Sequence, residues 1–204
     1  MIQVIKDEDI MKHIGEYDVI LIGTNVYCTL SQGVQRDVAL NYPYVREKNL
    51  LTKYGDISKL GTILECVSEG EPTFILLYMY RGYPYKKDKN DKADFVDYEA
   101  LKECLIKISL EYKDKKVGMT MIGCSRFDGN GSQDKILDMI HTYLENMDVT
   151  VYDFFQMSRD EKQIATRKRE LELKAKDYTL YYQAVKERKE KAEKRFQRNG
   201  FARY

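Results

Sequence analysis

The stretch VGMTMIGCSRFDGNG, residues 117–131, decides the fold of this chain. Residues 117–122 form an apolar run of strand length, and residues 123–131 form a loop with three glycines. The segment that follows, residues 132–146, places its aliphatic side chains at helical spacing. A buried strand, a glycine-rich loop and a helix in this order predict an α/β protein, with the loop at the carboxyl end of the strand.

The same alternation of strands and helices extends through residues 1–157. We expect strands at residues 1–5, 18–23, 62–67, 73–80, 117–122 and 149–155, and helices at residues 7–15, 33–41, 96–112 and 132–146. Asp7 is the expected N-cap of the first of these helices. Strands that alternate with helices favour a mostly parallel sheet in an α/β sandwich.

Two loops are candidates for a ligand site. The backbone N–H groups of residues 123–131, together with the N-terminus of the next helix, can approach a phosphate. The fingerprints GxGxxG and GxxxxGK[ST] are absent, so neither a dinucleotide-binding Rossmann site nor a P-loop is supported. A tight turn with positive φ angles is the alternative role of these glycines. Residues 24–34 form another strand-to-helix loop at the same edge of the sheet, where α/β proteins bind ligands.

In the order of these pieces the chain resembles a macro domain. Asn25, followed by Leu30-Ser31-Gln32-Gly33-Val34 and a helix, is similar to the first ligand loop of that family. The segment MIGCSRFD, residues 121–128, is similar to its second loop, which embraces a diphosphate. The segment VTVY, residues 149–152, is similar to its closing strand, and YEAL, residues 98–101, to a helix of the terminal ADP-ribose glycohydrolase branch.

The resemblance implies both a fold and a ligand. It covers roughly residues 1–155 and implies a macro-domain-like three-layer sandwich with a mixed, mostly parallel sheet. Macro domains bind ADP-ribose and some hydrolyse its esters, so Asn25 would contact the distal ribose. The diphosphate and its ribose would be bound by Gly33, Val34, Gly123, Cys124, Ser125, Arg126 and Phe127. Asp128 falls near the catalytic Asp of the glycohydrolase branch, and neither a metal nor a further cofactor is implied.

Three departures from the family pattern argue against catalysis. The first loop has a single glycine, in Ser31-Gln32-Gly33, where the family usually has a run. The second loop is one residue longer before Asp128. Where a catalytic Lys is expected the chain has Arg81, whose guanidinium stays protonated and cannot act as a nucleophile. Lys86 and Lys87 are alternative amines further along, so the sequence leaves open whether the protein is an enzyme.

The net charge of +1 is a cancellation between two parts of the chain. Lys and Arg outnumber Asp and Glu by 15 to 8 in residues 158–204, which gives that segment +7 and leaves −6 on residues 1–157. The division predicts an α/β domain at 1–157 and a basic arm at 158–204. A charge asymmetry of this kind indicates a partner rather than a fold.

The basic arm is expected to be a long helix. Residues 158–198 contain no Pro or Gly and are rich in Lys, Glu, Arg and Ala, and Ser158 with Glu161 forms a capping box. Docking on another protein subunit is expected through Ile164, Leu171, Tyr178, Val185, Phe196, Phe201 and Tyr204. The alternatives are a solvated helix against the domain and a contact with nucleic acid phosphates, which the eight acidic residues of the arm disfavour.

The remaining sequence features concern the compartment. Cys28, Cys66, Cys104 and Cys124 are scattered without a CxxC pair, which argues against a zinc site or a disulfide framework and favours a reducing compartment. No apolar run approaches the ~18–20 residues that span a bilayer. Because no signal-peptide core is present, we expect the protein in the cytoplasm or in a phage particle assembled there.

Two functional hypotheses follow from these observations. In the first, the macro-domain fold is a non-catalytic binding or assembly module, which the basic arm docks into a homo- or hetero-oligomer. A structural component of a tailed-phage particle is one example. In the second, the protein binds ADP-ribose or hydrolyses ADP-ribosyl groups at Asn25, Gly33 and residues 123–131.

Overall fold

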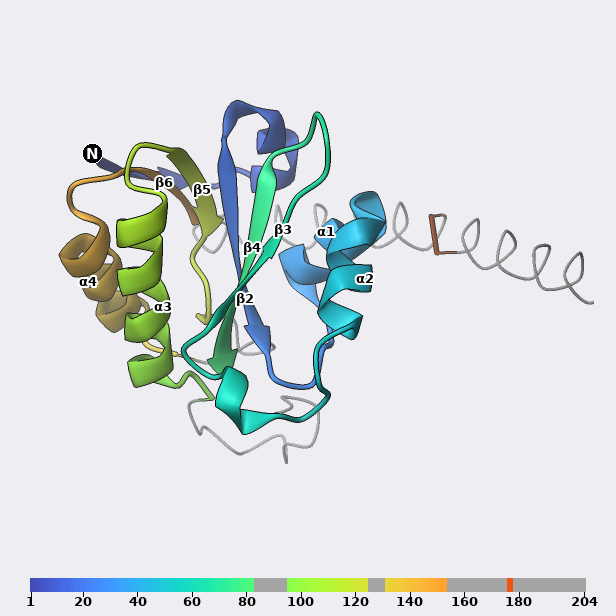
Figure 1. Cartoon of the computed structure of the whole chain (residues 1–204). Helices are drawn as coiled ribbons and strands as arrows, with labels where there is room; N and C mark the ends of the chain where they lie inside the picture. The colour runs from blue at the N-terminus through green and yellow to red at the C-terminus, as the bar shows by residue number, and fades with distance from the viewer. Residues whose placement is uncertain (83–94, 125–130, 154–175, 178–204) are drawn as a thin grey trace, which may run out of the picture. The chain divides into compact units, whose positions relative to one another are not determined.

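The computed structural model describes residues 1–82, 95–124, 131–153 and 176–177 (Figure 1). The chain divides into two compact units, Met1–Met157 and Ser158–Tyr204. The fold and the site described below belong to the first unit. None of the helices in the described ranges is long and apolar enough to cross a membrane. The expected docking residues of the arm lie outside the described residues, and so does almost all of its predicted helix.

A mixed sheet of six strands forms the centre of the described part of the first unit. The strand order is β1 (Ile2–Lys6), β6 (Asp148–Asp153), β5 (Lys116–Thr120), β2 (Val19–Asn25), β4 (Thr73–Tyr80) and β3 (Ile63–Cys66). Strands β1, β6, β5, β2 and β4 run parallel, and β3 pairs with β4 in the antiparallel direction. The carboxyl ends of β2, β4 and β5 therefore lie at one edge of the sheet.

Helices cover both faces of this sheet (Figure 1). One face carries α1 (Gly33–Asn41) and α2 (Pro43–Leu50), and the other carries α3 (Tyr98–Glu111) and α4 (Gln133–Leu144). Strand β2 shows why two cores form. Val19 and Leu21 pack in the core with α3 and α4, while Ile20 and Ile22 pack in the opposite core. Because these side chains alternate between two buried faces, the strand is a continuous apolar run, and the predicted three-layer sandwich is confirmed.

The predicted helix at residues 7–15 is wrong. Two short 3-10 helices occupy residues 10–16, and Asp9 rather than Asp7 is the N-cap, because its side chain accepts a hydrogen bond from Met11 N at 3.1 Å. Asp7 has φ +63° and donates its N–H to Asp153 O at 3.0 Å. Its backbone therefore ends the pairing of β1 with β6 and is not available to start a helix.

Helix α2 has no counterpart among the predicted elements. It buries only Val45 and Asn49, so it lacks the apolar spacing that indicates an amphipathic helix. Pro43 in its first turn is the signal that marks its start, since a helix tolerates proline there.

The other elements agree with the prediction. The bounds of α1 and β4 are the predicted ones, and the remaining predicted strands and helices differ from the observed ones by one or two residues at each end.

Candidate functional site

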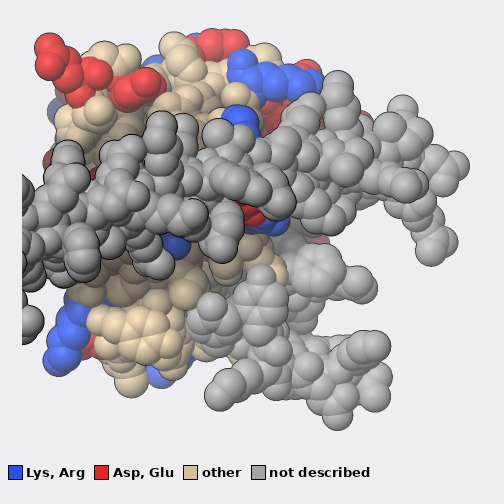
Figure 2. Space-filling view, turned by 90° about the vertical axis from the view of Figure 1, so that its right-hand side faces the viewer, with Lys and Arg blue, Asp and Glu red and all other residues tan. Residues whose placement is uncertain are grey.

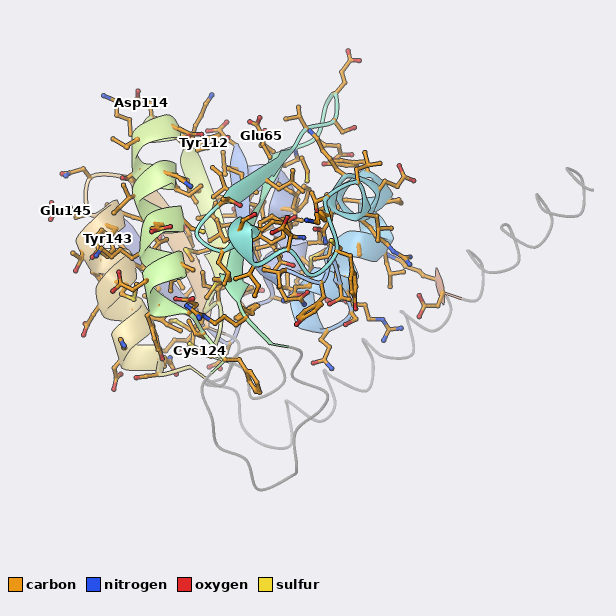
Figure 3. All side chains as sticks on the ribbon, turned by 60° about the horizontal axis from the view of Figure 1, so that its bottom comes forward. Glu65, Tyr112, Asp114, Cys124, Tyr143 and Glu145 are labelled. Atoms are coloured by element: carbon orange, nitrogen blue, oxygen red, sulfur yellow. The ribbon has the colours of Figure 1, made fainter. Side chains whose placement is uncertain are left out.

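Three strand-to-helix loops lie at the carboxyl edge of the sheet. They are the first loop (residues 25–33) after β2, the second loop (residues 123–131) after β5 and the third loop (residues 81–97) after β4. Figure 3 turns this edge towards the viewer and labels Cys124 in the second loop. Asn25 pairs with Tyr80 at the end of β4, which joins the first and third loops. Gly123 of the second loop packs closely against Val96 of the third loop, because a Cβ built on Gly123 would lie only 2.9 Å from Val96 Cγ2.

The side chain of Asn25 holds the first loop in shape. Its Nδ2 donates to Thr29 Oγ1 at 2.7 Å and to Thr29 O at 3.4 Å, and its Oδ1 accepts from Tyr27 N at 2.9 Å. Asn25 is buried, and the strand register shifts between Thr24 and Asn25, where the backbone leaves the sheet. The amide of Asn25 therefore has its hydrogen-bonding groups engaged within the loop.

The start of α1 differs from the starts of the other two helices at this edge. Asp97 caps α3 and Ser132 caps α4, whereas Gln32, the N-cap of α1, makes no side-chain capping bond. Gly33 has φ +50°, and a Cβ built on it would meet no atom within 4 Å. The side chain of Val34 packs on the core. The first-turn amides of a helix have no partner inside the helix, so this turn offers N–H groups to a ligand.

The base of the second loop is closed by tightly packed glycines. Gly131 N donates to Gly123 O at 2.8 Å, so the two ends of the loop meet. Gly123 has φ +76°, a conformation that favours glycine. A Cβ on Gly131 would lie 2.8 Å from Val96 Cγ2 and 3.0 Å from Ile136 Cδ1. These contacts require glycine at both ends of the loop.

An ion pair joins the two described ends of the third loop. Arg81 Nε donates to Asp97 Oδ2 at 2.6 Å, and Asp97 Oδ1 accepts from Ala100 N at 3.1 Å. Burial acts to raise the pKa of Asp97, but the hydrogen bonds from Ala100 and Arg81 outweigh it and hold that pKa below its ordinary value. The guanidinium at the position expected for a catalytic Lys is thus paired with a carboxylate.

A cavity of about 610 Å³ opens at this edge beside the third loop. It is lined by Arg81, Gly82, Phe95, Val96, Asp97, Tyr98, Glu99 and Lys135. Lys135 Nζ lies 3.5 Å from the centroid of the Tyr98 ring, a cation–π contact. Tyr98 OH also accepts from Ser132 N at 3.0 Å. Tyr98 therefore joins the start of α3 to the start of α4 at the wall of the cavity.

The structure brings part of the predicted site together. Asn25, Gly33, Val34, Gly123 and Cys124 all lie at the carboxyl edge. Their contacts with a ligand stay predictions. Ser125, Arg126, Phe127 and Asp128 lie outside the described residues, and so do Lys86 and Lys87.

Two residues that shape this edge, Asp97 and Lys135, were not singled out from the sequence. Asp97 stands directly before the helical run YEAL, so an N-cap pattern was present there. Tyr98 and Lys135 come from two different helices, and no sequence spacing connects them. In the described ranges there is no group of three or more His, Cys, Asp or Glu side chains that could hold a metal ion.

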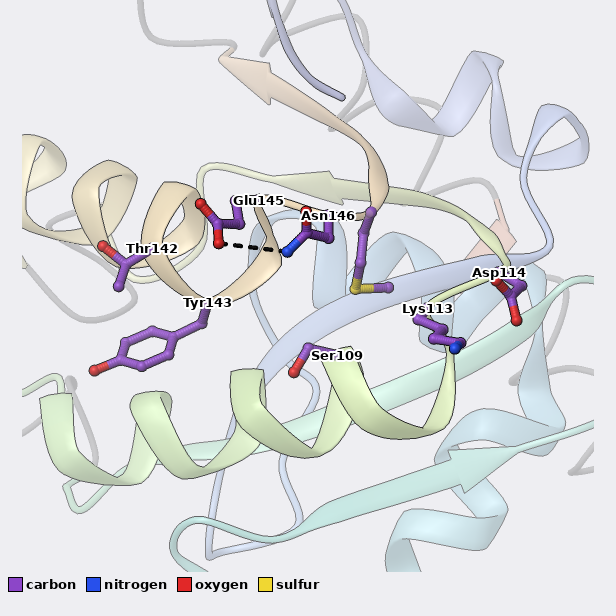
Figure 4. A pocket seen from close by; sticks show the side chains of 8 residues that line it. Ser109, Lys113, Asp114, Thr142, Tyr143, Glu145 and Asn146 are labelled. Atoms are coloured by element: carbon purple, nitrogen blue, oxygen red, sulfur yellow. Dashed lines mark hydrogen bonds between the residues drawn. The ribbon is translucent and has the colours of Figure 1, made fainter.

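A second hollow, of about 500 Å³, lies between the last turns of α3 and α4 (Figure 4). Its serine and threonine hydroxyls are already bonded within their own helices: Ser109 Oγ donates to Ile106 O and Thr142 Oγ1 to Asp138 O, each at 2.8 Å. The hollow lies away from the carboxyl edge, and helix C-termini repel anions. It is therefore a weaker candidate for a phosphate-bearing ligand.

Comparison with known proteins extends these observations. The sequence matches no protein-family model and no curated protein. A protein of unknown function from Bacteroides thetaiotaomicron is 23% identical, with a TM-score of 0.62 over 75% of this chain and 98% of that chain. The macrodomain of Mycobacterium tuberculosis DarG is 11% identical, with a TM-score of 0.55 over 75% of this chain and 97% of that chain. This chain has the macro-domain fold.

One of the similar solved structures contains a ligand. Thermosipho africanus DarTG, in complex with ADP-ribose, is 14% identical, with a TM-score of 0.52 over 72% of this chain and 40% of that chain. Identities this low establish the shared fold alone. In a chain with this fold, the three loops at the carboxyl edge are thus the first place to look for a ligand, because open α/β sheets bind ligands there.

Proposed function

We propose that this macro domain binds ADP-ribose, or a similar nucleoside diphosphate sugar, at the carboxyl edge of its sheet and does not hydrolyse it. The uncapped start of α1 is the observation that carries the proposal. The side chain of Gln32 makes no capping bond there and a Cβ on Gly33 would meet no atom within 4 Å, whereas α3 and α4 are capped by their own side chains. A helix N-terminus with free amides attracts a phosphate through its N–H groups and its dipole.

In this proposal, backbone N–H groups at the site bind the diphosphate. Figure 2 views the side of the molecule that bears α1 and α2, and both acidic and basic side chains show on it. Residues 1–157 also carry a net charge of −6, and a net negative charge does not attract a polyanion over a distance. A diphosphate would therefore be held by short contacts with the amides of Gly33 and Val34 and with those of the second loop.

The absence of hydrolysis is proposed from two side chains. Arg81 is paired with Asp97 and stays protonated, so it supplies no nucleophilic amine. The amide of Asn25 is engaged by Thr29 and Tyr27, so it supports the loop. Both features suit a domain that binds a ligand without reacting with it.

Titration calorimetry of the full chain with ADP-ribose tests the binding. The Gly33→Ala substitution places a methyl group in the open space beside the amides of α1, and we expect it to weaken binding at least about tenfold. Gly70→Ala is the matched control, because Gly70 has φ +77° and also meets nothing within 4 Å, in the turn before β4 at the opposite edge. Absence of heat with the folded wild-type protein contradicts the proposal.

Incubation with an ADP-ribosylated protein tests the second half of the proposal. We expect no release of ADP-ribose, and release that is lost in Asp128→Ala would make the protein a hydrolase. The assembly role of residues 158–204 and the phage particle stay predictions. Neither the described residues nor the related structures bear on them.

A further inference from the structure

A polar cluster joins the first loop to more distant segments, and none of its side chains is among the proposed ligand contacts. It contains one side chain of the loop, Cys28, and four from more distant segments: Asn49, Thr52, Lys59 and Tyr78. Cys28 is 6% exposed and has φ +55°, a left-handed conformation that is uncommon outside glycine. Its side chain is directed towards the amine of Lys59.

Three reactive or polar atoms form a triangle in this cluster. Lys59 Nζ lies 3.1 Å from Cys28 Sγ and 3.1 Å from Thr52 Oγ1, and these two atoms lie 3.1 Å from each other. Lys59 forms no ion pair with a carboxylate of the described residues, and its amine contacts the thiol and a hydroxyl instead. The amine and the thiol are thus held in contact before any reaction takes place, which removes most of the entropic cost of joining them.

Neighbouring groups fix this arrangement. Tyr78 OH donates to Asn49 Oδ1 at 2.8 Å, and Thr52 Oγ1 donates to Asn49 O at 2.8 Å. Burial raises the pKa of Tyr78 to about 12, so its hydroxyl remains a donor at neutral pH. Lys59 Nζ also lies 4.8 Å from the centre of the Tyr78 ring. The amine is therefore held on two sides, by the aromatic ring and by Thr52.

We propose that Cys28 and Lys59 are an oxidant-sensitive pair that hydrogen peroxide converts into a covalent sulfur–nitrogen bridge. Peroxide first oxidises the Cys28 thiolate by two electrons to a sulfenic acid and is itself reduced to water. Lys59 Nζ, as a neutral amine, then attacks the sulfur. The sulfur–nitrogen bond forms, the sulfur–oxygen bond breaks, and the hydroxyl group leaves as water with a proton from the nitrogen.

The reaction consumes one peroxide and releases two waters for each bridge. It joins the first loop to the 3-10 helix Ile57–Lys59, and it does not depend on the proposed ADP-ribose ligand. Reduction by a thiol returns both side chains to their original state, because a thiolate displaces nitrogen from sulfur as it does in other reversible sulfur oxidations.

The other cysteines differ from Cys28. Cys66 and Cys104 are fully buried, and burial raises the pKa of their thiols to about 11 and about 12. Because the thiolate is the nucleophile, these two residues react poorly with peroxide. Cys124 is partly exposed and its Sγ donates to Ile122 O at 3.5 Å. Reactive cysteines occur in electropositive, partly accessible surroundings, and Cys28 beside Lys59 meets the first condition.

Peptide mass spectrometry of the full chain tests the proposal. The protein is treated with hydrogen peroxide, its free thiols are alkylated, and it is digested with a protease that cleaves after acidic residues. We expect a linked pair of peptides containing Cys28 and Lys59, lighter than their sum by two hydrogens and separated by dithiothreitol. Lys59→Arg should abolish the pair, since a guanidinium is a poor nucleophile.

Lys53→Arg is the matched control, because Lys53 is a nearby lysine that pairs with Asp56 on the surface. We expect it to retain the linked peptides, and Cys28→Ser to lose them. Recovery of Cys28 as a free thiol, or as a sulfenic acid with Lys59 unmodified, overturns the proposal. A linked pair that retains an extra oxygen atom overturns the sulfur–nitrogen assignment, and a pair that persists in Lys59→Arg excludes Lys59.

Discussion

The first and second loops at the carboxyl edge of the sheet are shaped by different forces. In the first loop, the side chain of Asn25 makes hydrogen bonds to Thr29 and Tyr27. In the second loop, the described ends are brought together by close packing of Gly123 and Gly131 against apolar side chains. A group that loses a hydrogen-bond partner can bond to water instead, so one hydrogen bond contributes modestly to the free energy of unfolding. Water cannot relieve a steric overlap in this way. The second loop should therefore tolerate substitution less than the first.

The largest expected effect is that of Gly123→Ala. The new Cβ would lie 2.9 Å from Val96 Cγ2, 3.1 Å from Met79 Cε and 3.3 Å from Ile136 Cδ1, in a residue with φ +76°. Overpacking and a left-handed alanine together should lower the free energy of unfolding by about 3 kcal/mol. Urea denaturation followed by circular dichroism measures this loss.

Gly70→Ala separates the two causes, because Gly70 has φ +77° but no neighbour within 4 Å. Gly70→Ala should lower the free energy of unfolding by about 1 kcal/mol, which is the cost of a left-handed alanine backbone alone. Equal losses in the two variants would show that packing does not constrain the second loop, and the contrast between the loops would fail.

Asn25→Ala should have the next largest effect. It removes the hydrogen bonds of the first loop and leaves Tyr27 N and Thr29 Oγ1 without that partner, at a cost of about 2 kcal/mol. Asn146→Ala is the control, since Asn146 is exposed and bonds only to Glu145 at 3.3 Å among the described contacts. A loss larger for Asn25→Ala than for Gly123→Ala would reverse the comparison.

The smallest effect concerns the charged pair between the two described ends of the third loop, Arg81 and Asp97. The pKa of Asp97 lies below its ordinary value of about 3.9. A carboxyl with a lowered pKa stabilises the fold above the unfolded-state pKa, and that contribution is lost as the pH falls through its folded-state pKa. Because Arg81 is largely exposed, its pairing with Asp97 is worth about 1 kcal/mol or less.

Chemical denaturation of the wild type and of Asp97→Asn between pH 7 and the acid range, about pH 2, tests this sign. The wild type should be more stable at neutral pH, and the two curves should converge as the pH falls. A difference that stays constant with pH would assign the effect to the helix cap and not to the carboxylate charge.

Much of the fold could be predicted because it depends on local patterns. The continuous apolar run of β2 predicts burial on both faces. The bounds of α1 and β4 follow from the spacing of their apolar residues and from the loop-forming residues on either side. The first predicted helix failed where a distant contact decides the backbone: Asp7 is held at φ +63° and bonds to Asp153. Helix α2 was missed because it buries a polar residue, Asn49, where an apolar stripe is expected.

By itself the sequence determined the order of the six strands and of α1, α3 and α4, the glycines at the loops and the resemblance to a macro domain. Tertiary structure decided how the amide of Asn25 is used, the pairing of Arg81 with Asp97 and the contact between Cys28 and Lys59. The reason is physical. Apolar periodicity acts between neighbours along the chain, whereas a hydrogen bond between distant residues depends on where the whole fold places two atoms.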